Sequence, residues 1–181
     1  LLNDFLKDER GFSGARISLF VISTSTPAGL ALVAGGRLAD TRGRRWVVAA
    51  GVSGGAVLTA WSFTLAGWSM WATSLASTML AALAVPALGA YGPELFPTGS
   101  RGRANGILQV VSVIGSAAGL IVAGLVADRR GRIADGILVL LPPALLVAVL
   151  ALTVFPETAR RELEEINPED DLDPPLPPVP L

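Results

Sequence analysis

The residues of this sequence that could do chemistry are charged side chains in short segments between long apolar runs. The clearest group is a ten-residue segment, GRLADTRGRR, which runs from Gly36 to Arg45. Gly36 allows a close helix contact, Asp40 can cap or face the positive N-terminus of a helix, and Gly43 can form a tight turn. Arginines such as Arg44 and Arg45 are typical of the headgroup region of a membrane. The spacing predicts a charged turn at a membrane surface.

Composition argues against most enzyme classes. The 181-residue sequence contains no Cys and no His, so it lacks a thiol nucleophile, an imidazole base and the usual metal ligands. Hydrophobic residues make up 51% of the chain and charged residues 16%, against roughly 25% charged residues in an ordinary soluble domain. The basic residues are scattered and lack the aromatic platform of a nucleic-acid site. We therefore expect a chain embedded in a lipid bilayer, with no enzymatic activity, cofactor, metal site or nucleic-acid partner.

Five apolar runs are long enough to span a membrane as helices. Each has 20 to 23 residues without Asp, Glu, Lys or Arg, and twenty helical residues reach about the 30 Å thickness of a bilayer's hydrocarbon core. The runs cover residues 17–36, 46–66, 70–92, 104–126 and 136–155. We predict an all-α transmembrane domain over residues 17–156. Residues 1–16 are expected to form an extracytoplasmic loop at the end of a missing helix, and residues 157–181 a cytoplasmic tail that is acidic and rich in proline.

Prolines and glycines interrupt the apolar runs at defined places. Four prolines lie inside them, namely Pro27, Pro86, Pro142 and Pro143. Each removes a backbone hydrogen bond, so we expect bends in three of the five helices. Two pairs of glycines have the four-residue spacing with which membrane helices pack closely: Gly51 with Gly55, and Gly115 with Gly119.

The segment from Gly36 to Arg45 resembles the signature loop of the major facilitator superfamily, a family of secondary transporters. It matches the G-x-x-x-D-x-x-G-R-R pattern of that loop at every defined position. In the family this loop lies on the cytoplasmic side, after the second or the eighth helix, and its charges form a gate with the opposite half. The resemblance therefore implies that Asp40, Arg44 and Arg45 take part in a cytoplasmic gate.

Two further segments resemble parts of the same family. Residues 91–102, YGPELFPTGSRG, are similar to the E-x6-R-G loop after the fourth or tenth helix, and their Glu94 and Arg101 can pair across a turn. Residues 156–166, PETARRELEEI, are similar to the PETKG-x-x-LEEI ending after the twelfth helix of sugar porters, and contain Glu157. The fourth and fifth residues of that segment, Ala-Arg, depart from the Lys-Gly of the pattern. The resemblance thus extends to sugar porters and related metabolite transporters without naming a substrate.

These resemblances imply where the chain lies within such a transporter. The five spans correspond to helices eight to twelve of the C-terminal six-helix bundle, with the seventh helix missing or truncated and the N-terminal half absent. The protein is then a multi-pass protein of the cytoplasmic membrane with a cytoplasmic C-terminus. Its implied partners are the lipid bilayer, the N-terminal half of the same transporter and a small solute, moved alone or in symport with a coupling ion.

The signature pattern occurs a second time. Residues 124–132, GLVADRRGR, repeat the G-x-x-x-D-x-x-G-R spacing of residues 36–44 at an interval of 88 residues. Three spans separate the two starts, so the copies are predicted to lie on opposite membrane faces, as in two inverted three-helix repeats. Chance duplication of a helix-end pattern is the alternative. A parallel orientation of the first and fourth spans would contradict the repeat.

Polar side chains inside the spans are candidates for binding the solute. No ionisable residue lies inside any of the five runs, so a proton relay is not expected in this part of the protein. The candidates are Thr26, Ser77, Asn105 and Gln109. Hydroxyl groups in membrane helices also bond to their own backbone or to a neighbouring helix, and this structural role stays open for them.

A second class of function is open at this point. Spans rich in glycine and a tail rich in proline also suit a membrane scaffold or assembly protein that moves no solute. The ordered set of charged segments favours the transporter, because a scaffold does not require it. The sequence leaves open whether the native protein is a twelve-helix chain, one of two split polypeptides or the product of a degraded gene.

Overall fold

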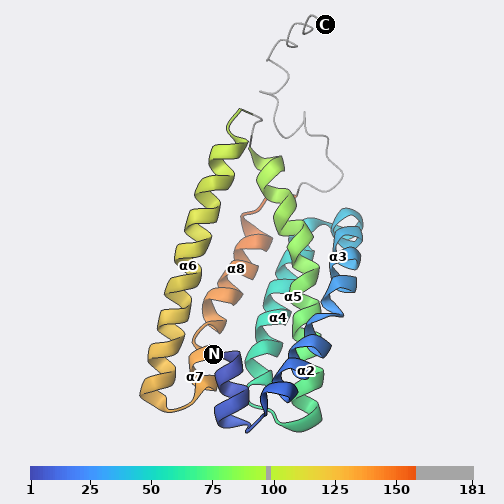
Figure 1. Ribbon diagram of the computed structural model, residues 1–181. Helices are drawn as coiled ribbons and strands as arrows, with labels where there is room; N and C mark the ends of the chain where they lie inside the picture. Colours follow the sequence, from blue (N-terminus) through green and yellow to red (C-terminus); the bar gives the residue numbers. More distant parts are fainter. Residues whose placement is uncertain (97–98, 158–181) are drawn as a thin grey trace, which may run out of the picture.

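The computed structural model describes residues 1–96 and 99–157, the side chains of residues 92–94 excepted. These residues form helices and no strand, and the long helices lie side by side in an elongated bundle (Figure 1). The elements are α1 (Leu2–Asp4), the π-helix η1 (Phe5–Glu9), α2 (Gly14–Ser25), α3 (Ala28–Arg42), α4 (Arg44–Ser62), α5 (Gly67–Leu95), α6 (Arg101–Arg130), α7 (Ile133–Leu138) and α8 (Leu141–Thr153). The predicted all-α fold is confirmed. The predicted tail lies outside the described residues from residue 158 onward.

Four helical segments of the described chain are long and apolar enough to cross a membrane, where five were expected. They are Gly14–Arg42, Gly67–Tyr91, Arg101–Arg130 and Ile133–Thr153. The expected span over residues 46–66 corresponds to α4, which is not among them. α4 begins with two arginines and ends at Ser62, four residues before the end of the predicted apolar run. Its apolar stretch is therefore shorter than the run expected from the sequence. Even so, α4 packs along α5 and α8 within the bundle (Figure 1).

The N-terminal segment contains short helices where a loop was expected. α1 and η1 make residues 2–9 helical, and α2 begins three residues before the predicted apolar run. The side chains of Phe5 and Leu6 are fully buried, since they pack against Phe63 and Met70 in a cluster at this end of the bundle. The segment is therefore part of the folded core and lies at the lower end of the bundle in Figure 1.

The prolines act on the helices in two different ways. Pro27 separates α2 from α3, and Pro142 and Pro143 lie in the first turn of α8, directly after the break that ends α7. A first-turn proline is tolerated because the N–H it lacks has no partner inside the helix. Pro86 instead lies within α5, which is assigned as one continuous helix of 29 residues. The helical structure is thus interrupted at Pro27 and before the Pro142 pair, whereas it continues through Pro86, so a bend expected there would occur within an unbroken helix.

The turns of the chain fall into two groups at opposite ends of the bundle. In Figure 1 the turn between α3 and α4, the end of α5, the start of α6 and the end of α8 lie toward the upper end. The N-terminus, the turn between α4 and α5 and the turn between α6 and α7 lie at the lower end. This arrangement matches the order of crossings expected from the sequence, and it brings Gly43 and Glu157 to the same end.

Buried side chains form two clusters, one toward each end. The upper cluster joins α3, α4, α5 and α8 through small residues, with Ala39, Val48, Ala87, Tyr91 and Ala151 among its members. The lower cluster is rich in aromatic residues, and its ring centroids lie 4.6 Å apart for Phe5 and Phe63. Most of the large apolar side chains of α6 are exposed, as expected of a helix whose surroundings are lipid or another helix.

Glycines set the distances between α5 and its two neighbours. A Cβ atom added at Gly51 would lie 2.8 Å from both the Cβ atom of Ala84 and the carbonyl oxygen of Leu80, so α4 and α5 touch here. Gly55 is similarly close to α5, which confirms the packing role predicted for this pair. On α3 the close approach is made by Gly35, where an added Cβ atom would lie 2.8 Å from the Cα atom of Leu83 and would also meet its carbonyl oxygen.

Other glycines do not have the packing role expected from their spacing. An added Cβ atom at Gly36 would meet only Pro86, at an ordinary 3.9 Å, so the close contact expected at Gly36 belongs to its neighbour Gly35. Gly115 and Gly119 have no close neighbour among the described residues apart from a Leu140 side chain 3.8 Å from an added Cβ atom at Gly119. The second glycine pair therefore does not pack helices together in the described chain.

We expect Gly35→Ala to destabilise the bundle, because its methyl group would meet the backbone of α5 where no side chain can move away. Overpacking of this kind costs about 1–3 kcal/mol. Gly29→Ala on the same helix is the matched control, since nothing lies within 4 Å of its added Cβ atom. The measurement is the thermal unfolding midpoint in detergent, and equal midpoints for the two variants would contradict the close contact.

Candidate functional site

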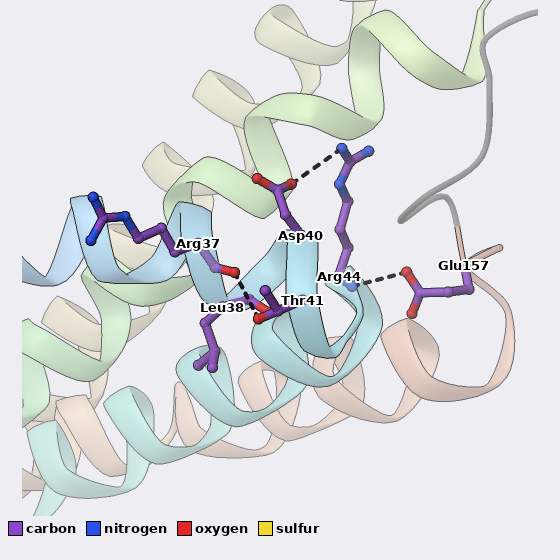
Figure 2. A network of polar contacts seen from close by, with 6 residues as sticks. All are labelled: Arg37, Leu38, Asp40, Thr41, Arg44 and Glu157. Atoms are coloured by element: carbon purple, nitrogen blue, oxygen red, sulfur yellow. Dashed lines mark hydrogen bonds and ion pairs between the residues drawn. The ribbon is translucent and has the colours of Figure 1, made fainter.

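The charged turn predicted from the sequence is closed by a carboxylate from the far end of the chain. The backbone N–H of Arg44 donates to Oε1 of Glu157 at 2.9 Å, and that of Arg45 donates to Oε2 at 3.4 Å (Figure 2). These two N–H groups are at the start of α4 and have no acceptor inside the helix. Glu157 therefore caps α4 across more than one hundred residues of sequence, and its negative charge faces the positive end of the helix dipole.

Gly43 makes this contact possible. Its φ of 102° lies in a region that other residues rarely adopt, and its N–H donates to the carbonyl oxygen of Ala39 at 3.2 Å, which ends α3. An added Cβ atom at this position would lie 2.6 Å from Oε2 of Glu157. A side chain here would thus strain the backbone and displace the carboxylate, so the tight turn predicted at Gly43 is confirmed.

Asp40 lies one turn before the cap and faces outward. Its carboxylate is 3.8 Å from the guanidinium of Arg44, with the Asp40 side chain 70% exposed and that of Arg44 13% exposed (Figure 2). Arg45 points the other way, and its Nε donates to the carbonyl oxygen of Ala151 on α8 at 3.3 Å. The two arginines therefore hold the turn from two sides and leave the Asp40 carboxylate at the surface.

A cavity of about 480 Å³ opens beside this cap. It is lined by Thr41, Arg42, Gly43, Arg45, Trp46, Leu152 and Glu157. The hydroxyl of Thr41 donates to the carbonyl oxygens of Arg37 and Leu38, which completes the last turn of α3 (Figure 2). The cavity thus joins the exposed basic residues of the turn to the end of α8.

Tyr91 is a residue of this site that the sequence did not single out. Its ring packs edge-on against Phe155, with centroids 5.2 Å apart, and lies in the same cluster as the start of α4. Its hydroxyl oxygen is buried and has no hydrogen-bond partner among the described residues. Tyr91 therefore ties α5 to the segment that carries Glu157.

The second charge pair expected from the sequence lies partly outside the described residues. Glu94 is at the end of α5, but its side chain is outside the described part of the structure. Arg101 begins α6, and its Nε is buried. Of the six charged residues singled out from the sequence, the structure places Asp40, Arg44, Arg45 and Glu157 together.

Comparison with protein-family models gives a match over nearly the whole chain. The model described as Major Facilitator Superfamily matches residues 1–180. The chain belongs to the major facilitator superfamily. Comparison with the curated proteins and with the solved structures gives no match. The family and the four apolar helices together make this a multi-pass membrane protein of a transporter family.

The two copies of the signature pattern in this facilitator share a glycine with positive φ and the same hydrogen bond at the end of the helix. At the second copy Gly131 has a φ of 70°, and its N–H donates to the carbonyl oxygen of Ala127 at 2.8 Å, as Gly43 does to Ala39. α3 runs upward and α6 downward in Figure 1, so the copies lie at opposite ends of the bundle, as predicted. The parallel orientation that would have contradicted the inverted repeat is absent from these two described helices.

A glutamate also caps the helix after the second copy. The N–H of Ile133, at the start of α7, donates to Oε1 of Glu9 at 2.7 Å. Ile133 follows Gly131 by two residues, as Arg45 follows Gly43, so the two capped N–H groups occupy equivalent positions. Only the spacing of the glycine pattern could have indicated this site, because nothing in the sequence around Glu9 marks it as a cap.

Arg10, next to Glu9, was likewise not predicted. Its guanidinium donates to the carbonyl oxygens of Phe63 at 3.3 Å and Leu65 at 2.8 Å, and lies 4.7 Å from the centre of the Phe5 ring. Both carbonyls are in the turn that follows α4. This facilitator thus uses Arg10 to close the lower end of the helix that Glu157 closes at the upper end.

The four candidates for solute binding are placed in different surroundings. Ser77 is buried on α5 and lines a cavity in the interior of the bundle. Thr26 is exposed at the break between α2 and α3, and Asn105 and Gln109 are exposed on α6. These three do not line that cavity, so the structure does not bring the four candidates together.

We expect Glu157→Ala to lower the stability of this facilitator, because it removes both hydrogen bonds at the start of α4. Loss of a helix N-cap costs about 0.5–2 kcal/mol. Glu157→Gln keeps an oxygen that can accept a hydrogen bond but removes the charge, so its loss of stability should be smaller than that of Glu157→Ala. The measurement is thermal unfolding in detergent, with Asp8→Ala as a control at an exposed acidic residue. Glu157→Ala unfolding at the native midpoint would rule out a stabilising cap.

Proposed function

We propose that this chain forms the C-terminal half of a secondary transporter that moves a small solute across the cell membrane by alternating access. The match to the superfamily supports the transporter class, and the order of the charged segments supports the C-terminal half. In this proposal α2 with α3, then α4, α5 and α6, and finally α7 with α8 are helices eight to twelve. The N-terminal half of the same transporter is the partner that completes the solute pathway.

The contact between Glu157 and the start of α4 is the observation that carries this proposal. It uses both carboxylate oxygens on backbone N–H groups, so the end of α8 is tied to the α3–α4 turn. Asp40 and Arg42 remain exposed on that turn, where the opposite half can reach them. They act as a cytoplasmic clamp that holds the halves together while the cavity opens outward.

The clamp needs only modest interactions to work. Exposed ion pairs contribute about 0.2–1 kcal/mol each, which is too little to lock one state. Two states of nearly equal free energy are nevertheless biased by a few such pairs. A coupling ion for symport would bind in a part of the transporter outside this chain, because the five apolar runs of this chain contain no ionisable residue.

The orientation in this proposal is tested by labelling, because the chain has no native cysteine. We expect Asp8→Cys to react with a membrane-impermeant maleimide in intact cells, and Gly99→Cys to react only after the cells are opened. Both residues are exposed. Asp8 is part of η1 and Gly99 precedes α6 by two residues, and in Figure 1 the N-terminal helices and the start of α6 lie toward opposite ends of the bundle. Labelling of Gly99→Cys in intact cells would reverse the proposed orientation.

The clamp is tested by Asp40→Asn in the polypeptide that contains both halves. We expect the rate of solute uptake to fall about fivefold, which corresponds to the loss of about one exposed ion pair, while membrane insertion is unchanged. To identify the solute, proteoliposomes and protein-free liposomes are incubated with the same metabolite extract. Mass spectrometry then identifies the solutes that enter only the proteoliposomes. Asp8→Asn is the matched control. Native uptake by a well-inserted Asp40→Asn variant would contradict the clamp.

A further inference from the structure

Three buried polar side chains of the described chain border a single cavity in the bundle. Thr24 on α2, Ser62 on α4 and Ser77 on α5 are buried, and all three line a cavity of about 420 Å³. Cavities that bind small molecules measure about 300–1,000 Å³. The rest of the lining is apolar and includes Phe20 and Leu120. The cavity therefore combines a group of hydroxyls, called the hydroxyl wall below, with an apolar lining.

The three buried hydroxyl groups donate their hydrogen atoms to carbonyl oxygens of their own helices. Thr24 donates to the carbonyl oxygen of Phe20 at 2.8 Å, Ser62 to that of Thr59 at 2.7 Å, and Ser77 to that of Ser74 at 2.9 Å. A hydroxyl group has one hydrogen to donate and two lone pairs with which to accept. Once the hydrogen is bonded to the helix backbone, the oxygen can only accept.

Further hydroxyl groups add to this wall. Thr78 also donates to the carbonyl oxygen of Ser74, while Ser25, Thr59 and Ser74 line the cavity with hydroxyls that can turn to donate or to accept. Four of the seven hydroxyls are thus restricted to accepting. The wall as a whole offers more acceptors than donors to anything inside the cavity.

The lack of charged side chains in the lining limits which ligands can bind. Among the described residues that line the cavity there is no acidic or basic side chain, and the terminal ammonium group of Leu1, another lining residue, is paired with Asp4 at 2.9 Å. A cation would therefore lose its hydration without gaining a counter-charge, and an anion would face oxygen lone pairs. A neutral molecule that donates hydrogen bonds from an apolar body avoids both costs.

We propose that this cavity is a binding site for a neutral, largely apolar solute that donates one or more N–H or O–H hydrogen bonds to the hydroxyl wall. The identification of this ligand with the transported solute rests on the proposed function. The binding itself does not, because it is measured without transport. There are two alternatives: the hydroxyl groups bonded to their own helix only serve packing, or the cavity binds any apolar molecule. In both cases the cavity would show no preference for a ligand that donates a hydrogen bond.

The test uses the purified full chain in lipid nanodiscs and two probes of the same shape. Indole has one N–H donor, and benzofuran has a ring oxygen at the same place. We expect saturable binding of indole, measured against empty nanodiscs, and about fivefold weaker binding of benzofuran, the effect of one lost hydrogen bond. Equal binding of the two probes, or no saturable binding of either, would overturn the proposal.

Two variants locate the preference in the cavity. Thr24→Val keeps the shape of the side chain and removes an accepting oxygen, so indole should bind about fivefold more weakly while benzofuran is unaffected. Ser77→Ala should act in the same way, and it serves if Thr24→Val does not fold. Thr73→Val is the control, because Thr73 on α5 makes the same bond to its own helix, at 2.7 Å to Ser69, outside the cavity.

The outcomes separate this proposal from the proposed function. Native affinity for indole in folded Thr24→Val and Ser77→Ala overturns the binding site, whatever the uptake measurements show. Donor-selective binding that these variants weaken and Thr73→Val preserves supports the site, even where the Asp40→Asn experiment contradicts the clamp.

Discussion

The packing of this protein depends on α4, whose two ends are closed by charges from distant parts of the sequence. Glu157 accepts from the first N–H groups of the helix, and Arg10 donates to two carbonyls in the turn that follows it. Each charge has the sign that the helix dipole favours at its end. Unpaired backbone groups are especially costly near a bilayer, where water is scarce. The capped helix can therefore pack against α5 and α8 with both of its ends satisfied.

The position of α4 also explains its composition. Gly51 and Gly55 let α5 approach closely, and Val47, Val48 and Ala49 are buried against other helices. A helix that packs on protein along much of its length needs less apolar surface than one that faces lipid. α6 shows the opposite case, because most of its large apolar side chains are exposed. The two helices thus differ in how much of their apolar surface is exposed, as their surroundings require.

The contacts that cap α4 also tie three helices together at the upper end of the bundle. Glu157 comes after α8, and Arg45 bonds to Ala151 within α8, so the start of α4 is held to α8 through both backbone and side chain. A displacement of α8 relative to the α3–α4 turn would have to break these bonds and uncap the helix. The upper ends of α3, α4 and α8 therefore behave as one unit, and Asp40 moves with it.

Sequence patterns predicted the parts of this structure that depend on local chemistry. Apolar runs predicted the helices, and Gly43 was expected at a tight turn because few other residues adopt its φ. The break at Pro27 follows from the missing N–H of proline. Glu157 was singled out because it lies in a family pattern, but its contact with the start of α4 was not predicted. Glu9 and Arg10 lie in a segment without such a pattern, and their partners are turns more than fifty residues away.

The two glutamate caps bear on whether the repeated glycine pattern is a chance duplication. Chance could place two similar turns in one chain, but each turn is followed by an N–H group bonded to a remote glutamate, at equivalent positions. The glutamates themselves are not equivalent: adding the 88-residue interval to Glu9 gives position 97, far from Glu157 in sequence. The pattern therefore repeats a physical requirement, an acidic group at the exposed start of a helix after a glycine turn. Each end of the bundle meets that requirement with the acidic residue that its own chain segment supplies.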